Sequence, residues 1–549
     1  MSLTYLIRPK TALLSAALVL GGCSSSAVDE SSNTDAQTSD DTNDGSTTGD
    51  ASSSSTTANS GGGSGTTTGP ESTTGDASST GGDDTDTDDG SAGDALPGYG
   101  DDGDGCDPES ISAIGLELPD SNAMVSPVQA RMAVLDGWGI FGDLFIRPWE
   151  FLAYYPFDYA PAPPGELALR AELYVAKDQP EGSYELQVGV TGPWLSDEAR
   201  PPLDLTLVLD VSGSMKGVPV TILKEACKAL LTRLRAGDGV SIVTWDSDDP
   251  VLLAHHQVSG PSDPDLKALI DGLEATGGSD LFAGLSAGYE LAAETKDPER
   301  VSRVILMSDG GAAADAKALE LIDSHASDKG AQEGIYLVGV GVGTYGGYQP
   351  ALMDSVAAVG RGSTLFIGSA DEANKTLADR FLSVMLVAAR DVEVEVVLPP
   401  GFSRRLPEEL IYGDAPTSDL RQPMRQNEAL VYYERLASCA PEQIDDSSPL
   451  EVRVTYRDAA TFEPGEVVLQ TTFGELLSKG VKQLHKGAAV VRYSEALRLW
   501  NEAPSDPEAY LSAAQAALGR VALAQAKIPD DPGLAEIESV LNALLKGMQ

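Results

Sequence analysis

The fold is decided by one stretch of the sequence, Leu203-Asp204-Leu205-Thr206-Leu207-Val208-Leu209-Asp210-Val211-Ser212-Gly213-Ser214-Met215. Its first seven residues are mostly apolar and follow Pro202, which predicts a short buried strand. A turn of small and polar residues comes next, with a carboxylate at Asp210 and hydroxyls at Ser212 and Ser214. In an open parallel sheet, ligands bind beyond the carboxyl ends of the strands, so this turn is a candidate binding site.

Short apolar segments alternate with helical ones after this stretch. We expect strands at Val240–Trp245, Val304–Met307, Gly334–Val342 and Thr364–Ile367, and helices at Val218–Leu234, 264–273, 281–296, Ala316–Ala326, Pro350–Val359 and 370–388. Such an alternation predicts a mostly parallel sheet with helices on both faces. Residues 201–388 are therefore predicted to form an α/β domain with a doubly wound sheet.

Segments of β character lie on both sides of this domain. Leu167–Ala176 and Tyr184–Thr191 alternate apolar and polar residues, which favours a hairpin, and further strands are expected at Val392–Leu398, Ala429–Arg435, Leu450–Tyr456 and Val467–Thr472. We therefore expect the α/β domain to be inserted in a β-sandwich, with a β-rich domain at 389–472 that pairs with 165–192. The Ala- and Leu-rich stretches 473–500, 506–526 and 533–547 predict a helical region at 473–549, and residues 111–200 combine a helical, aromatic segment at 126–160 with the hairpin.

The amino terminus has the features of an export signal. Arg8 and Lys10 precede the apolar run Thr11–Leu20, which is too short to span a bilayer, and Leu20-Gly21-Gly22-Cys23 follows. Residues 1–23 resemble a bacterial lipoprotein signal, which implies a lipid anchor at Cys23. The residue after it, Ser24, favours the outer membrane in that resemblance, facing either the periplasm or the cell surface. An ordinary cleaved signal with an incidental cysteine is the alternative.

A long acidic linker is expected at residues 24–110. Residues 24–105 hold 18 acidic residues and neither Lys nor Arg, a composition that predicts a disordered, extended stalk. The whole chain of 549 residues has a formal net charge of -47. Such a surface repels nucleic acid and anionic lipid headgroups, whereas it can concentrate divalent cations. We therefore expect no nucleic-acid partner.

Four cysteines occur in the chain, and no two of them form a CxxC pair, so a zinc site is not expected. Cys106 and Cys439 could form a disulfide in an oxidising compartment. Cys227 lies in a predicted helix and is interpreted as a small core residue.

Two further loops are expected at the same edge of the sheet as Asp210. One is Thr276-Gly277-Gly278-Ser279-Asp280, and the other is Ser308-Asp309-Gly310. Hydroxyl and carboxylate oxygens without His or Cys suit a hard cation, in first place Mg²⁺, with Mn²⁺ and Ca²⁺ as alternatives. In this interpretation Ser212, Ser214 and Ser279 bind the metal directly, while Asp210 and Asp309 hold bound waters. Because the direct ligands are neutral, the metal would keep its charge and take an Asp or Glu of a partner protein.

These loops, in this order, resemble the metal-ion-dependent adhesion site of von Willebrand A domains, and the resemblance covers about residues 203–388. It implies an adhesion or protein-binding domain. The family usually has Thr where this chain has Ser279, and Thr276 is an alternative ligand. The flanking segments, including Phe151-Leu-Ala-Tyr-Tyr-Pro-Phe-Asp-Tyr-Ala, resemble bacterial lipoproteins of the YfbK type. That second resemblance implies the domain order and leaves the biochemistry open.

An enzyme is not expected, because the sequence contains no HExxH or P-loop pattern. The adjacent His255 and His256 are interpreted as solvated residues of a loop that follows a strand, pointing to different sides. The alternative function is a structural or assembly factor of the cell envelope, in which the metal only stabilises loops. The aromatic residues between Trp149 and Tyr159 either bind carbohydrate or peptide or, as we favour, dock this segment onto the neighbouring domain.

Overall fold

The computed structural model describes residues 107–116, 123–136, 146–177, 179–245, 250–330, 332–344, 347–404, 422–502 and 506–546. The expected signal peptide and its Cys23, Cys106, and nearly all of the expected linker lie outside these ranges. Within the described ranges, no helix combines the length and the apolar character that crossing a bilayer requires.

The chain contains a seven-stranded, mostly parallel sheet with the strand order β2-β10-β9-β8-β5-β6-β7. Only β7, at one edge, runs antiparallel to its neighbour. Every residue of β5, β6 and β9 is buried, as the continuous apolar runs predict. The strands are β2 (Ala123–Met124), β5 (Leu203–Leu209), β6 (Gly239–Thr244), β7 (Val251–Gln257), β8 (Val301–Ser308), β9 (Tyr336–Val342) and β10 (Arg361–Ile367).

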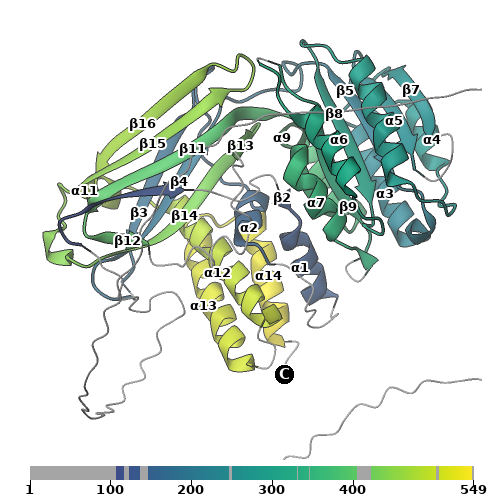
Figure 1. Ribbon diagram of the computed structural model, residues 1–549. Helices are drawn as coiled ribbons and strands as arrows, with labels where there is room; N and C mark the ends of the chain where they lie inside the picture. The colour runs from purple at the N-terminus through teal and green to yellow at the C-terminus, as the bar shows by residue number, and fades with distance from the viewer. Residues whose placement is uncertain are drawn as a thin grey trace, which may run out of the picture. The chain divides into compact units, whose positions relative to one another are not determined.

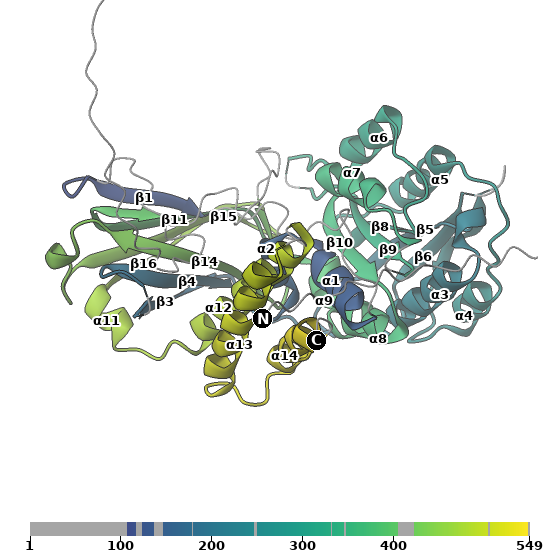
Figure 2. The same cartoon turned by 90° about the horizontal axis from the view of Figure 1, so that it is seen from below.

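Helices cover both faces of this sheet, which confirms the predicted α/β class. In Figure 2, α5, α6 and α7 lie on one side of the strands, and α3, α4 and α8 lie on the other. These helices are α3 (Val218–Leu231), α4 (Pro264–Asp271), α5 (Leu281–Glu294), α6 (Ala316–Ala326), α7 (Ala351–Gly360) and α8 (Ala370–Ala373).

The prediction of one regular closing helix at 370–388 is wrong. It consists of α8, a π-helical stretch over Asn374–Asp379 and the short α9 (Phe381–Met385), and the chain is extended from Leu386. The sequence from Phe381 to Ala389 is almost continuously apolar, so its periodicity does not distinguish the end of a buried helix from the start of a buried strand.

The segment before the hairpin joins the parallel sheet, which the sequence analysis did not predict. β2 pairs in parallel with β10, and the helices α1 (Ser126–Leu135) and α2 (Pro148–Tyr154) follow it. The aromatic side chains of this segment support the docking interpretation over a binding platform, because all but the half-buried Tyr159 are buried: Trp149, Phe151, Tyr154, Tyr155 and Phe157. The ring of Phe151 packs edge-on against Tyr493 of the carboxy-terminal region, with centroids 5.4 Å apart.

Two antiparallel sheets lie outside the α/β domain (Figure 1). A five-stranded sheet contains β1 (Ile111–Leu116), β11 (Val387–Pro400), β13 (Gln422–Arg425), β15 (Pro449–Asp458) and β16 (Pro464–Thr472). A four-stranded sheet contains β3 (Ala168–Val175), β4 (Ser183–Thr191), β12 (Phe402–Arg404) and β14 (Ala429–Ser438). Apolar side chains of both sheets, among them Leu173, Val188, Val396 and Val452, belong to one buried cluster.

The chain leaves these sheets after β4 and returns to them at β11, so the α/β domain is inserted as predicted. β3 and β4 form the expected hairpin, and β4 pairs with β14 across about 245 residues of sequence. The strand β1 was not predicted; it pairs with β11 and closes one edge of the five-stranded sheet.

Helices form the carboxy-terminal region, namely α11 (Phe473–Leu477), α12 (Lys482–Glu502), α13 (Pro507–Gln525) and α14 (Pro532–Lys546). The single helix expected at 473–500 is two helices, because the chain leaves the helical path around Gly480, a poor helix former. α12 packs against β3, β4 and β14, and buried ion pairs join this region to the sheet. Arg520 pairs with Glu185 at 2.7 Å, and Glu495 pairs with Arg435 at 2.9 Å.

Candidate metal centre

The first loop of the candidate site begins where β5 ends. The amide of Asp210 still donates to the carbonyl of Met307 in β8, which fixes the carboxylate at the edge of the sheet. One carboxylate oxygen of Asp210 accepts the amide of Ser212 at 2.9 Å, and the hydroxyls of Ser212 and Ser214 lie 3.1 Å apart. The turn thus holds three oxygen-bearing side chains at one place, as their alternation in the sequence predicted.

The second loop follows β8 and is bonded to the first. The Ser308 hydroxyl donates to the Asp210 carboxylate at 2.6 Å, and the Ser214 hydroxyl donates to the Asp309 carboxylate at 3.3 Å. The amide of Gly311 also donates to Asp309, at 2.9 Å. We call these five side chains the rim cluster: Asp210, Ser212, Ser214, Ser308 and Asp309. Residues almost one hundred positions apart therefore meet at one edge of the sheet.

The backbone after Asp309 is held in a conformation that requires glycine. Gly310 has φ +83°, and a β-carbon there would collide with the carbonyl oxygen of Gln349. The amide of Gln349 donates to the carbonyl of Asp309 at 2.9 Å. The turn before α7 is thus a support for the Asp309 loop that no sequence motif indicated.

The third loop lies beside the first. The amide of Thr276 donates to the carbonyl of Val211 at 2.8 Å, and a β-carbon on Gly213 would lie 3.6 Å from the α-carbon of Gly277. Asp280 caps α5 by accepting the amide of Ala283. Thr276 and Ser279 are both exposed. No hydrogen bond within the described residues joins Ser279 to the rim cluster, so its role as a direct ligand stays a prediction.

The two carboxylates of the rim cluster are buried without a basic partner. Asp210 is 0% exposed and Asp309 is 4% exposed, and neither forms an ion pair with any described residue. Burial raises the pKa of Asp210, although hydrogen bonds from Ser308 and Ser212 oppose that shift. Buried carboxylates are normally paired with a cation or bind a metal. The oxygen-only donor set and its lack of a protein cation therefore fit a hard divalent ion.

Ser308 is the member of this cluster to which the sequence analysis gave no role. Its hydroxyl is fully buried, donates to Asp210 and accepts the amide of Gly310 at 2.9 Å. It therefore fixes the orientation of the Asp210 carboxylate and the path of the second loop at once. Its position directly before Asp309 was the only sequence signal.

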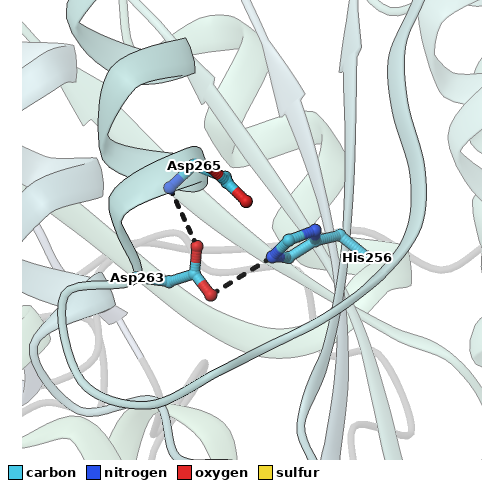
Figure 3. Close-up of side chains that lie close together, drawn as sticks. All are labelled: His256, Asp263 and Asp265. Atoms are coloured by element: carbon cyan, nitrogen blue, oxygen red, sulfur yellow. Dashed lines mark hydrogen bonds and ion pairs between the residues drawn. The ribbon is translucent and has the colours of Figure 1, made fainter.

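A second group of potential ligands lies on the same domain at His256, Asp263 and Asp265 (Figure 3). Asp263 caps α4 by accepting the amides of Asp265 and Leu266, and it also accepts the amide and the hydroxyl of Ser259 and contacts His256 at 3.2 Å. Burial acts to raise the pKa of Asp263, but these hydrogen bonds hold it well below its usual range. Because a carboxylate offers about four acceptor sites, Asp263 has little capacity left for a metal.

His255 and His256 lie inside β7, so their interpretation as solvated loop residues is wrong. They do point to different sides: His255 contacts Glu294 of α5 at 2.9 Å, and His256 contacts Asp263 before α4. β7 is a half-exposed edge strand with register shifts, and its apolar run ends at Ala254, directly before the two histidines.

The cysteines fit a structural role. Cys227 is buried and free, and burial raises the pKa of its thiol to about 12, as expected for a core residue. Cys439 is disulfide-bonded. Because Cys106 lies outside the described residues, the pairing of Cys106 with Cys439 stays a prediction.

Comparison with known proteins identifies the α/β domain. Residues 203–366 match the von Willebrand factor type A domain. The chain is 28% identical over 266 residues to the uncharacterized protein YfbK of Escherichia coli, covering 47% of this chain and 45% of that protein. It is also 28% identical over 222 residues to the uncharacterized protein sll0103 of Synechocystis, covering 40% of this chain and 51% of that protein.

Among solved structures, a von Willebrand factor type A protein from Catenulispora acidiphila aligns with 71% of this chain and 97% of its own, at 15% identity and a TM-score of 0.40. The chain spans about half the length of YfbK and of sll0103.

Proposed function

Starting from a von Willebrand factor type A domain at residues 203–366, we propose that this protein binds a partner protein through a Mg²⁺-dependent adhesion site. In this proposal Ser212, Ser214 and Ser279 hold the metal directly, and Asp210 and Asp309 hold it through water. When bound, the metal supplies a positive charge that attracts an Asp or Glu side chain of the partner. The function is binding, and no catalytic step is assigned.

The single observation that carries the proposal is the composition of the rim cluster. Two buried carboxylates and three hydroxyls are bonded to one another, and no Lys, Arg or His of the described chain neutralises them. Ser214 and Ser279 are exposed, so the site opens to solvent at the edge where a partner could reach it. A metal that only stabilised loops would not need to be accessible to a partner. The exposure of the site therefore favours ligand binding over the structural alternative.

We further propose that a lipid on Cys23 anchors the protein in the outer membrane. The support is the small-residue sequence before Cys23 and the acidic composition of residues 24–105. Mass spectrometry of the amino-terminal peptide from membranes tests this proposal. An unmodified or removed Cys23 would overturn the anchor, and the adhesion site would be unaffected.

Metal binding is tested first. Mn²⁺ titration followed by electron paramagnetic resonance should show one site that Mg²⁺ displaces. Ser214→Ala removes an exposed hydroxyl and should weaken Mn²⁺ binding at least tenfold, while Asp265→Asn, in the His256 group, should leave it unchanged. Equal Mn²⁺ affinity of the wild type and Ser214→Ala would exclude the rim cluster as the metal site.

Partner binding is tested second, in a pull-down from envelope extract with either Mg²⁺ or EDTA. Partners captured only with Mg²⁺ by the wild type, and lost with Ser214→Ala and Asp210→Ala, would agree with adhesion. Ser214→Ala is the decisive variant, because Asp210 is buried and its removal could also disturb folding. Recovery of the same partners in EDTA would favour the structural alternative.

A further inference from the structure

Two apolar side chains are exposed where the helices next to the candidate metal site begin. Val218 is the first residue of α3 and is 50% exposed, and Phe282 is the second residue of α5 and is 40% exposed. The neighbouring Leu281 is only 7% exposed, so it fills the core while Phe282 does not. Single exposed apolar side chains are common on protein surfaces, so the significance of these two depends on their position next to the candidate site.

Chain connectivity places both residues near the loops of the candidate site. Val218 follows Ser214 by four residues, and Phe282 follows Ser279 by three residues. At no more than about 3.6 Å per residue, the α-carbons in each pair lie within about 15 Å of each other. The two loops also touch each other, since Gly213 lies against Gly277. Val218 and Phe282 therefore begin helices that start near the candidate site and cover opposite faces of the sheet (Figure 2).

The loops next to these two residues are rich in glycine, and the first carries an exposed lysine. Gly213, Gly277 and Gly311 have no side chains, and Phe282 itself is 40% exposed. Lys216 is exposed between Ser214 and Val218. This arrangement favours a ligand that is negative at one position and apolar next to it.

We infer that the site recognises a protein segment in which an Asp or Glu is adjacent to a large apolar residue, and that Phe282 and Val218 contact the apolar residue. This inference rests on the proposed function, because the acidic residue needs the metal. Phe282 and Val218 are specificity residues in this view, since they add affinity for one class of acidic segment and take no part in metal binding. Lys216 adds charge complementarity to the acidic residue.

The test uses synthetic peptides coupled at equal density to a biosensor surface. One contains Phe-Asp between glycines, the second contains Gly-Asp, and the third contains Phe-Asn. In Mg²⁺, the wild-type chain should bind the Phe-Asp surface about fivefold more tightly than the Gly-Asp surface, an increment typical of partial burial of one aromatic ring. It should bind neither the Phe-Asn surface nor any surface in EDTA.

Phe282→Ala should remove the preference for Phe-Asp and leave binding to Gly-Asp unchanged. Leu523→Ala, which removes an apolar side chain that is 49% exposed on α13, is the matched control and should keep the preference. Equal wild-type binding to Phe-Asp and Gly-Asp, or an equal loss with both variants, overturns the apolar contact and leaves the adhesion site standing. Failure of both acidic surfaces to bind in Mg²⁺ overturns carboxylate capture itself, and the apolar contact with it.

Discussion

Two polar clusters of the molecule differ in where their countercharge comes from. The rim cluster contains carboxylates whose described partners are hydroxyls and backbone amides. The other cluster, here called the buried ion network, joins α1, α2, α8, the π-helical stretch and α14 and consists of Arg131, Tyr154, Glu372, Lys375 and Glu536. In it Arg131 lies 2.6 Å from Glu372 and 2.9 Å from Glu536, and Lys375 lies 3.4 Å from Glu536.

The difference separates a structural cluster from the cluster that we propose to bind a metal. Each carboxylate of the buried ion network has a protein cation within reach, so the network is complete without a ligand. The carboxylates of the rim cluster are as deeply buried and lack such a cation, which leaves their charge for an external ion. Oxygen atoms gathered in a fold thus indicate a metal site only when the chain does not itself neutralise them.

The largest expected effect comes from breaking the buried ion network. Glu372→Ala removes the closest partner of Arg131 but leaves it paired with Glu536, so the loss should be that of a charged hydrogen bond, up to about 3 kcal/mol. Ser214→Ala in the rim cluster should change the unfolding free energy in EDTA by less than about 0.5 kcal/mol. Urea unfolding in EDTA measures both variants. Similar losses for the two would remove the distinction between the clusters.

Low pH should weaken the ion pairs that extend the buried ion network. Glu428 belongs to an extension of the network, where it pairs with Arg380 and Arg425. Burial acts to raise its pKa, but the two guanidinium groups lower it to about 2 from an ordinary value of 4.5. The carboxyl thus binds a proton more readily in the unfolded chain, so its contribution is complete above pH 4.5 and is lost as the pH falls toward 2.

Glu428→Gln should therefore lower stability at pH 7 and make the remaining stability less sensitive to pH between 4.5 and 2. Urea unfolding at several pH values shows the effect as a flatter curve. A variant curve parallel to that of the wild type over this window would mean that other groups cause the acid sensitivity.

Magnesium should act only on the rim cluster. At a free Mg²⁺ concentration of 100 times the Kd, binding to the folded state raises the unfolding free energy by about 2.7 kcal/mol. The same addition should leave the stability of Asp309→Ala unchanged and should still stabilise Glu372→Ala, provided that variant remains folded. Thermal unfolding with Mg²⁺ and with EDTA measures this shift. Stabilisation of Asp309→Ala by Mg²⁺ would point to a different site.

The smallest effect on metal binding is expected at the His256 group, whose side chains resemble a metal site only because they lie close together. Asp263→Ala removes the cap of α4 and the acceptor of Ser259, and should lower the unfolding free energy by about 2 kcal/mol. Mn²⁺ affinity should stay the same, because the acceptor sites of Asp263 are already used by the protein. A loss of Mn²⁺ binding in this variant would make the His256 group a second metal centre.

The local pattern of apolar and polar residues was sufficient to predict most strands and helices of the α/β domain. The strand at β5 and the helix α6 were predicted with their observed bounds, and the order of the three loops placed Asp210, Ser212, Ser214 and Asp309 together. These features depend on periodicity and on short spacing, which a single sequence displays. The function of Ser308 could not be predicted, since many buried serines precede a turn without fixing a carboxylate.

The pairings between distant segments were decided by the tertiary structure. β1 and β2 are short and carry no strong pattern, yet one pairs with β11 and the other with β10, more than 200 residues away. The buried ion network likewise unites Arg131, Glu372 and Glu536, which look like ordinary surface residues of three helices in the sequence. By itself the sequence determined most of the elements and the oxygen-rich loops, because side-chain type and spacing are local properties. Which charges receive a partner depends on which elements pack together, and only the folded chain decides that.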